Sequence, residues 1–304
     1  MYSDPSIYIF YPKGIIYNVD MKKMIIDTDI GFDPDDLFTL LLAFNSPEVD
    51  ISLITTDDEI DSKRAEFTKT ILKACHREDI PVVCGTRSNN NYFVVDELLE
   101  KPDFKFDDDY IGSMKKVIDE NDEVIYLGIG GFTNLANFYK KYPDYRDKFD
   151  VFMMGGAIDY NRGENWVEHN IKIDKSSARY IIENPPKNLS LIMAQTTFQT
   201  EYKVEENHPI FQKLKRSSNP AHILLIKHLE LSRQKIPGWT KMMSDPLTFA
   251  IAIGKDFVTF HRSNISIDQN GNMNLDPSGK EIYWSDPESK KNEFMEFLES
   301  HLFP

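Results

Sequence analysis

The sequence has only two cysteines, Cys75 and Cys84. Two cysteines cannot build a disulfide framework, and because both fall in apolar segments we expect them to be buried and unreactive. It also lacks any apolar run long enough to cross a membrane. Basic residues are outnumbered, with 35 Lys and Arg against 49 Asp and Glu and a formal net charge of −14. That deficit argues against nucleic acid or an anionic membrane as partner and favours a metal or a small neutral or cationic ligand.

The N-terminus carries an aromatic run, IYIFYPKGIIY, which Pro12 and Gly14 interrupt. No basic region precedes this run and no small-residue cleavage site follows it, so we do not interpret it as a secretion signal. We therefore expect a cytoplasmic protein. Residues 1–20 would be an added arm or strand, because Met21 can itself begin a complete first element.

The strongest chemical signal lies in the segment MIIDTDIGFDPDDLFTLLLAF, residues 24–44. A short apolar strand is followed within ten residues by five aspartates, namely Asp27, Asp29, Asp33, Asp35 and Asp36. Carboxylates this close repel one another, so the loop needs a compensating cation. Helix capping would explain Asp33 and Asp36 but not the two acids at the end of the strand. Oxygen ligands without His or Cys at zinc-like spacing favour Ca²⁺ or Mg²⁺.

Apolar strands and amphipathic helices alternate along most of the chain. We expect strands at 24–28, 49–55, 81–84, 123–127, 150–154 and 189–194. Helices are expected at 34–44, 62–76, 133–142 and 174–183, the first with Asp33 as N-cap and Pro34 as its first residue. This alternation predicts an α/β fold with a mostly parallel, Rossmann-like central sheet flanked by helices. Because ligands bind beyond the carboxyl ends of such strands, the loops there should line one crevice.

The remaining segments are patterned differently. Residues 85–109 read as a long surface loop with a weak helix at 96–100. Helices at 204–215, 221–234 and 245–254 follow, and residues 200–243 are expected to form a helical cap. Short antiparallel strands at 257–284, with a hairpin turn at Asn270-Gly271, precede a last helix at 288–302. We see no linker or repeat, so residues 1–304 are interpreted as a single domain.

The acidic stretch DTDIGFDPDD resembles the N-terminal signature of the nucleoside hydrolases, DxDPGxDDxxAL, in a longer form with two inserted residues. Three more motifs follow in the family's order. GGFTNLA at 130–136 is similar to TGPLTNxA, and MMGG at 153–156 with EHN at 168–170 resembles MGG followed by EFN. SDPL at 244–247 resembles HDPLA. Together these motifs span residues 24 to about 255.

The resemblance implies a calcium-dependent hydrolase that cleaves the N-glycosidic bond of ribonucleosides or related ribosides to free base and ribose. It implies that Asp29 is both a Ca²⁺ ligand and the base that activates water. Asp36, the main-chain carbonyl of Ile129 and Asp245 would complete the metal site. The two-residue insertion leaves open whether Asp33 takes the place of one of the other aspartates as a ligand.

Asp35, Glu168 and Asn170 would hold the ribose hydroxyls if the resemblance extends to the sugar site. The transition state of such a cleavage resembles an oxocarbenium ion, so negative charge near the ribose and a positioned water suit the reaction. The family resemblance also implies purine or pyrimidine salvage and a homodimer or homotetramer.

The sequence departs from the family pattern where the leaving base would be protonated. The histidine that often precedes the last aspartate is Ser244 here, and serine is not a general acid near neutral pH without help. The asparagine expected after the second strand is also missing, and Asp57 or Asp58 occupies that region, which makes Asp58 a candidate substrate contact.

Three aromatic residues are further candidates near the substrate. His169 replaces the usual phenylalanine of the EFN motif. Because neighbours on an extended segment point in opposite directions, we expect it to be packed beside the sugar site, with substrate contact as the alternative. Trp166 and Trp239 could stack on a base or simply pack in the core or a lid.

Two other functions remain open. A protein that kept the metal site but lost turnover would bind nucleosides or ribose without cleaving them. A strand followed by DxD is also typical of HAD-type phosphatases, in which Asp27 would be the nucleophile and Asp29 the general acid, with Mg²⁺. That second alternative leaves the other three motifs as coincidences.

Overall fold

A computed structural model describes residues 8–10, 16–18, 21–87, 90, 92–100, 105–158, 160, 163, 166–238 and 242–304. Its strands are β1 (Tyr8–Phe10), β2 (Ile16–Asn18), β3 (Lys22–Thr28), β4 (Val49–Thr56), β5 (Val82–Cys84), β6 (Val124–Gly128), β7 (Asp150–Met154), β8 (Leu189–Ile192), β9 (Val258–Ile267), β10 (Met273–Leu275) and β11 (Lys280–Ser289). Its α-helices are α1 (Asp35–Phe44), α2 (Lys63–Ala74), α3 (Tyr110–Glu120), α4 (Thr133–Lys141), α5 (His169–Ile173), α6 (Lys175–Glu183), α7 (Ala194–Thr197), α8 (Pro209–Lys215), α9 (Pro220–Lys235), α10 (Ser244–Ala252) and α11 (Lys291–Leu302). Short 3-10 helices lie at Asp96–Leu98, Pro143–Tyr145 and Thr200–Tyr202.

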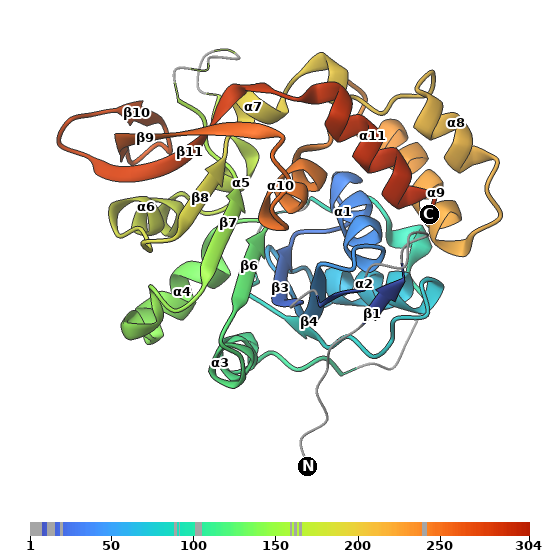
Figure 1. Ribbon diagram of the computed structural model, residues 1–304, viewed down its shortest axis with the longest axis horizontal. Coiled ribbons are helices and arrows are strands. Elements are labelled where there is room, and N and C mark those ends of the chain that lie inside the picture. The colour runs from blue at the N-terminus through green and yellow to red at the C-terminus, as the bar shows by residue number, and fades with distance from the viewer. Residues whose placement is uncertain are drawn as a thin grey trace.

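Within these described ranges, nine strands form one sheet in the order β10-β9-β11-β8-β7-β6-β3-β4-β5 (Figure 1). Neighbouring strands from β11 through to β5 are parallel, whereas β9 runs antiparallel to both β10 and β11. The predicted α/β fold, with a mostly parallel sheet and a small antiparallel C-terminal part, is confirmed. β1 and β2 pair antiparallel as a separate ribbon ahead of it.

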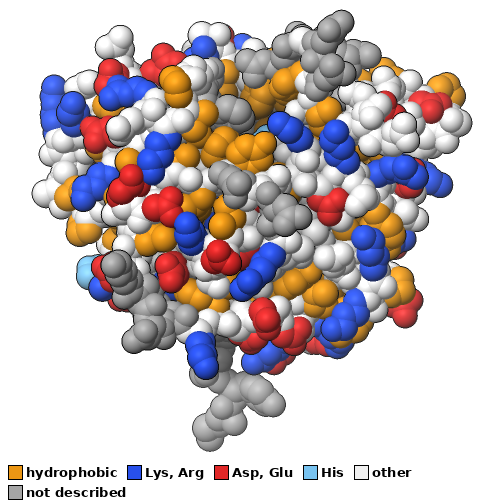
Figure 2. All heavy atoms as spheres, turned by 180° about the vertical axis from the view of Figure 1, so that it is seen from behind, with side chains coloured by type: hydrophobic (Ala, Val, Ile, Leu, Met, Phe, Trp, Pro, Cys, Tyr) orange, Lys and Arg blue, Asp and Glu red, His pale blue; other side chains and the backbone are white. Residues whose placement is uncertain are grey.

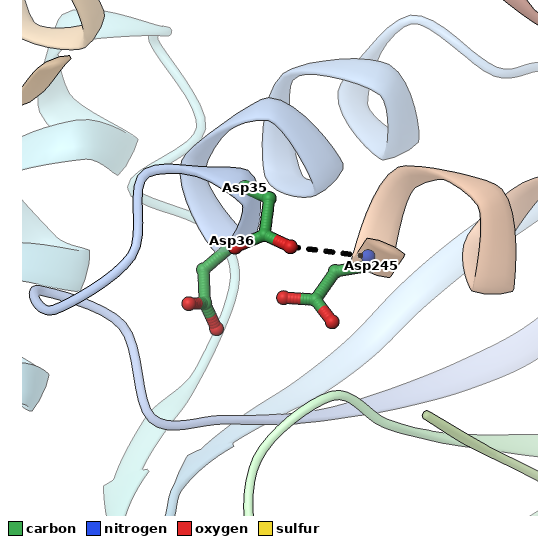
Figure 3. Close-up of side chains that lie close together, drawn as sticks. All are labelled: Asp35, Asp36 and Asp245. Carbon is green, nitrogen blue, oxygen red and sulfur yellow. Dashed lines mark hydrogen bonds between the residues drawn. The ribbon is translucent and has the colours of Figure 1, made fainter. Parts of the chain in front are cut away.

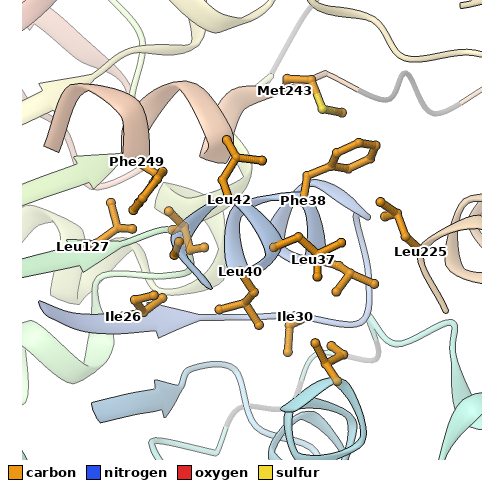
Figure 4. Close-up of a cluster of buried hydrophobic side chains, with 14 of the residues drawn as sticks. Ile26, Ile30, Leu37, Phe38, Leu40, Leu42, Leu127, Leu225, Met243 and Phe249 are labelled. Atoms are coloured by element: carbon orange, nitrogen blue, oxygen red, sulfur yellow. The ribbon is translucent and has the colours of Figure 1, made fainter. Parts of the chain in front are cut away.

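Both faces of the sheet are covered by helices, as the side chains of strand β3 illustrate. Met24 and Ile26 pack into the core formed with α1, α2, α9, α10 and α11, while Ile25 packs into the core formed with α3, α4 and α6 (Figures 1 and 4). Successive side chains of a strand point to opposite faces, so a strand buried on both sides must be apolar throughout.

Helix α1 is buried almost all round, because it lies between the sheet and other helices. Leu40 projects from it on the side of Ile26 and Ile30, and Leu37 projects on the side of Leu225 (Figure 4). The prediction that Asp33 caps this helix is wrong. Pro34 occupies the N-cap position with nearly helical angles, φ −71° and ψ −13°, and no side chain caps the first turn. The Asp33 side chain lines a pocket instead.

Three α-helices, α3, α5 and the four-residue α7, were not predicted. α3 begins at Tyr110, after its N-cap Asp109, whose side chain accepts a hydrogen bond from the backbone N–H of Gly112. Gly112 in the first turn lowers the helix propensity of this segment. α5 is only five residues long and begins after Glu168, so the expectation of an extended segment around His169 is wrong. Other predicted boundaries also shift. The strand expected to reach residue 194 ends at Ile192, and the helix expected from residue 204 begins at Pro209.

The surface and the cysteines bear on what the protein can bind. On the face drawn in Figure 2, acidic and basic side chains are interspersed, so this face offers no continuous positive surface for a polyanion. Among the described residues, no helix combines the length and apolarity that crossing a membrane requires. Cys84 is buried and Cys75 half-buried, and both are free thiols. Burial raises the pKa of each thiol to about 11, which makes them poor nucleophiles.

Candidate active site

Three buried aspartates from distant parts of the chain face one another at the carboxyl edge of the sheet (Figure 3). Asp35 and Asp36 stand in the first turn of α1, and Asp245 stands in the first turn of α10. Each offers a carboxylate oxygen, and these oxygens lie within 4.8 Å of one another. The backbone N–H of Asp245 donates to Oδ2 of Asp35 at 3.3 Å, and the hydroxyl of Thr28 donates to Oδ1 of Asp36.

Burial and mutual repulsion disfavour the charged forms of these carboxyls. Burial raises the pKa of Asp36 well above its usual value, and the charges of Asp29 and Asp35 raise it further. Burial likewise raises the pKa of Asp245, followed by the charges of Asp35, Asp36 and Asp29. A cation between the carboxylates would remove both penalties at once.

The donor set fits a hard divalent cation. The described residues of this cluster are all aspartates, without the His or Cys ligands that zinc prefers. Of the predicted ligands, Asp36 and Asp245 are in this cluster, where Asp35 joins them; Asp29 is not part of the cluster, although its charge raises the pKa of both Asp36 and Asp245. The carbonyl of Ile129 lies at the same edge of the sheet, directly after β6. Oxygen ligands of this kind suit Ca²⁺ or Mg²⁺.

The loop carrying Asp29 is held in place by a buried arginine, Arg64 of α2. Its guanidinium donates to the main-chain carbonyls of Asp29 and Ile30, the latter at 2.9 Å, and to that of Tyr92 at 2.8 Å. It also forms a fully buried ion pair with Asp58 at 2.8 Å. Arg64 was not singled out in the sequence, although its position three residues before the buried Phe67 places it on the inner face of α2.

Asp58, the predicted substrate contact on the second strand's loop, has both carboxylate oxygens engaged. Oδ2 accepts from Arg64 and Oδ1 accepts from the side chain of Asn90 at 2.9 Å. Its φ of +50° is a left-handed conformation that Asp and Asn tolerate better than most residues. The neighbouring Asp57 is fully buried, and its Oδ1 accepts from the backbone N–H of Asp58 at 2.8 Å.

Asp27 lies beneath the site rather than in it. Oδ1 accepts from Thr55 at 2.7 Å and from Asn134 at 2.8 Å, and Oδ2 accepts from the hydroxyl of Tyr126. Burial raises the pKa of Asp27 to about 6, although the three hydrogen bonds lower it. A fully buried carboxylate with both oxygens engaged cannot attack a phosphate, so the geometry does not support the HAD-type alternative.

Glu168 and Asn170 are fixed by main-chain contacts. The carboxylate of Glu168 accepts backbone N–H groups of Gly156, Asn170 and Ile171 at 3.0 to 3.1 Å. Nδ2 of Asn170 donates to the carbonyl of Met154 at 3.0 Å and to that of Ile129 at 3.3 Å. The two predicted sugar ligands therefore join the ends of β6 and β7 to the start of α5, beside the predicted metal carbonyl.

His169 lies between these two residues in the sequence, and its ring approaches the carboxylate of Asp29. Its Nε2 is 3.5 Å from Oδ2 of Asp29, its ring stacks on Phe32 with centroids 5.3 Å apart, and the ring of Tyr92 meets it edge-on at 5.1 Å. Burial lowers the pKa of His169, but the hydrogen bond and charge of Asp29, together with Glu168 and Asp33, raise it on balance.

A pocket of about 360 Å³ adjoins the carboxylates. Its lining includes Asp33, Tyr92, Trp166, Val167, His169, Lys172, Phe198, Gly238, Met242 and Ser244. Trp166 and Phe198 meet edge-to-face, with ring centroids 6.3 Å apart. The other tryptophan proposed for stacking, Trp239, lies outside the described residues. Tyr92 and Phe198 carried no sequence signal, because neither belongs to a motif and only the fold brings them here.

Buried carboxylates beside an aromatic pocket at the carboxyl ends of parallel strands define an α/β enzyme that binds a small polar molecule. The chain belongs to the inosine-uridine preferring nucleoside hydrolase family, whose model matches residues 24–295. Family membership supports N-ribosyl hydrolase activity, that is, hydrolysis of the N-glycosidic bond of ribonucleosides. The resemblance inferred from the four motifs is confirmed.

A relative and two solved structures are similar to this chain. The chain is 23% identical over 272 residues to the pyrimidine-specific ribonucleoside hydrolase RihA of Escherichia coli O1:K1 / APEC, covering 82% of this chain and 85% of the relative. The fold matches the plant nucleoside hydrolase PpNRh1 with a TM-score of 0.77 at 19% identity, covering 93% and 99% of the two chains. It matches a purine-preferring ribonucleoside hydrolase from Gardnerella vaginalis with a TM-score of 0.74 at 20% identity, covering 92% and 98%.

Proposed function

We propose that this protein is a calcium-dependent hydrolase that cleaves ribosides with Asp29 as the base. The observation that carries the proposal is the cluster of Asp35, Asp36 and Asp245, three buried carboxylates facing one another beside Asp29. Such a cluster is costly to bury unless a cation occupies it. Ca²⁺ accepts six to eight oxygen ligands in flexible geometry, which leaves room for substrate hydroxyls, whereas Mg²⁺ demands a tighter octahedron.

Asp29, Asp36, Asp245 and the carbonyl of Ile129 would hold the ion. Bound there, calcium would grip the ribose hydroxyls, orient the attacking water and lower its pKa. Asp33 is half-buried at the pocket wall, so we assign it to the pocket rather than to the ion.

The chain's own residues supply the proton acceptor and the sugar clamp. The carboxylate of Asp29 takes the proton of the water as its oxygen attacks C1′. Arg64 holds the Asp29 main chain through its carbonyl, so the base is positioned before substrate arrives. Asp35, Glu168 and Asn170 hold the ribose hydroxyls, and the main-chain hydrogen bonds of Glu168 keep that carboxylate from turning away.

Ribose release tests the proposal directly. Purified protein would be incubated with neutral and N-alkylated, permanently cationic ribosides, with Ca²⁺ or with a chelator, and free ribose measured as reducing sugar. Cleavage should require Ca²⁺ and should be abolished by Asp29→Ala, whereas the exposed Asp122→Asn serves as a matched control that keeps full activity. Retained activity in Asp29→Ala would overturn the assigned base.

A riboside-binding protein without turnover is the second candidate, and Ser244 is the observation that favours it. Calorimetry with the same ribosides and Ca²⁺ separates the two functions. Binding without release of ribose from any riboside would establish the binding protein and refute the hydrolase.

A further inference from the structure

A hydrolase that binds the base of its substrate in the pocket beside the carboxylates must stabilise that base as it leaves. When the C1′–N bond of a neutral nucleoside breaks, the electron pair stays on the base, which must then gain a proton or be stabilised as an anion. Ser244 stands at the head of α10, next to Asp245, where the pocket meets the carboxylates. Its hydroxyl does not give up a proton readily enough to serve as a general acid near neutral pH.

The histidine that lines this pocket is turned toward another group. His169 places Nε2 3.5 Å from Oδ2 of Asp29. One face of its ring is stacked on Phe32 and the edge of Tyr92 closes against it. This nitrogen is paired with the proposed base Asp29, so it is not turned toward a leaving group bound among the aromatic rings of the pocket.

The same pocket is well suited to a positive charge. Asp33 contributes a carboxylate to its wall, and Trp166, Tyr92 and Phe198 contribute aromatic rings. Aromatic faces attract cations within about 6 Å, most strongly in the order Trp, Tyr, Phe. Asp29 and the three carboxyls of Asp35, Asp36 and Asp245 lie close by, and mutual repulsion within this group favours a positive charge in the adjoining pocket. The lysine among the lining residues, Lys172, is exposed, and its ammonium lies 5.9 Å from the ring centroid of Tyr92.

We propose that the preferred substrates are ribosides whose base already carries a positive charge, such as N7-alkylated purine nucleosides or pyridinium ribosides. The inference rests on the proposed hydrolase function and names the substrate class of that site. In the reaction the C1′–N bond breaks and its electron pair neutralises the cationic ring, so the base leaves as a neutral molecule without any proton donor. The water oxygen bonds to C1′, and its proton passes to Asp29 and then to solvent.

The matched pair inosine and 7-methylinosine tests this when assayed below the pKa of the N1–H of 7-methylinosine, because there the two differ by one methyl group and one positive charge. General acid catalysis, which contributes roughly 10² to 10⁴-fold, would narrow the difference between the two substrates. A site that lacks it and also binds the cation should therefore give a kcat/KM ratio for 7-methylinosine over inosine above the ratio of their uncatalysed rates. Uncatalysed hydrolysis of both compounds is measured alongside, and the preference must exceed the uncatalysed ratio. A pyridinium riboside should be cleaved as well.

Three variants identify the cause of the preference. Ser244→His should reduce the 7-methylinosine to inosine ratio at least about tenfold by restoring a donor. Asp33→Asn should raise KM for 7-methylinosine more than for inosine, while Asp33→Glu should restore part of the preference. His169→Phe should slow both substrates by a similar factor, because the residue acts through Asp29; selective loss of inosine cleavage would make His169 the general acid and overturn the proposal.

The outcomes distinguish the substrate class from the hydrolase activity itself. Cleavage of inosine and 7-methylinosine in the ratio of their uncatalysed rates refutes the substrate class and leaves the hydrolase intact. Failure to release ribose from 7-methylinosine, inosine and the pyridinium riboside in the presence of Ca²⁺ refutes the hydrolase itself.

Discussion

Replacing Arg64 with methionine should destabilise the protein and loosen the loop that carries Asp29. The guanidinium is fully buried and donates to four carbonyls and to the carboxylate of Asp58. Methionine fills much of the same volume but leaves the Asp58 carboxylate without its cation.

The expected size follows from that uncompensated charge. Removing one partner of a buried ion pair costs about 3 to 5 kcal/mol. Four carbonyls lose a donor in addition, so we expect the upper half of this range for Arg64→Met. Asp58→Asn alone should cost less, because asparagine keeps the acceptor toward Arg64 and tolerates the φ of +50° at this position.

Urea unfolding of the two single variants and the double variant forms a double-mutant cycle. In the double variant no buried charge is left unpaired, so it should be more stable than the sum of the single effects predicts by at least about 2 kcal/mol. The same samples should show weaker Ca²⁺ binding for Arg64→Met, since the Asp29 carbonyl is released. A loss below about 1 kcal/mol for Arg64→Met, or strict additivity in the cycle, would refute the structural role assigned to this pair.

Three further outcomes follow from the site. Removing Ca²⁺ with a chelator should lower the melting temperature, because Ca²⁺ at 100 times its dissociation constant stabilises a protein by about 2.7 kcal/mol. The melting temperature of Asp36→Asn should change much less on chelation. Equal changes in the two proteins would exclude Asp36 as a ligand. In metal-free buffer, the raised pKa of Asp245, caused by burial and then by Asp35, contributes stability below the unfolded pKa that is lost as pH rises through the folded pKa. Wild type should therefore lose stability relative to Asp245→Asn as the pH rises above about 4, the ordinary pKa of an aspartate, and Ca²⁺ should restore it; a pH-independent difference would contradict this. Glu168→Gln should cost about 1 to 3 kcal/mol, because an amide nitrogen cannot accept the N–H groups that the carboxylate accepts, and urea unfolding that detects no loss would argue against this capping role.

Several elements could be predicted because their signals are local. The apolar strand ending in Thr28 and the leucine spacing of α1 each identify one element without reference to the rest of the chain. The start of α1 was misplaced because Asp33 and Pro34 also suit a helix cap, and only the packed loop shows that Asp33 turns into the pocket. α5 could not be predicted because five residues are too few for a periodic pattern.

The site residues likewise divide into those that a sequence motif predicts and those that only the fold brings to the site. The four motifs named the aspartates and the sugar-binding candidates, since each motif is a short run of sequence. Arg64, Tyr92 and Phe198 belong to no motif, and they reach the site only because α2, the loop after β5 and the segment after α7 fold against it.

The sequence alone determined the α/β class, the family and the concentration of acidic residues that calls for a cation, because these depend on local periodicity and on residue identity. Only the tertiary structure decided which carboxylates face one another, which one is paired with Arg64, which accept hydrogen bonds, and where His169 points. The physical reason is that a charge's partners are set by distances of a few ångströms between segments far apart in the chain, here Asp35 and Asp245. No pattern along the sequence measures those distances.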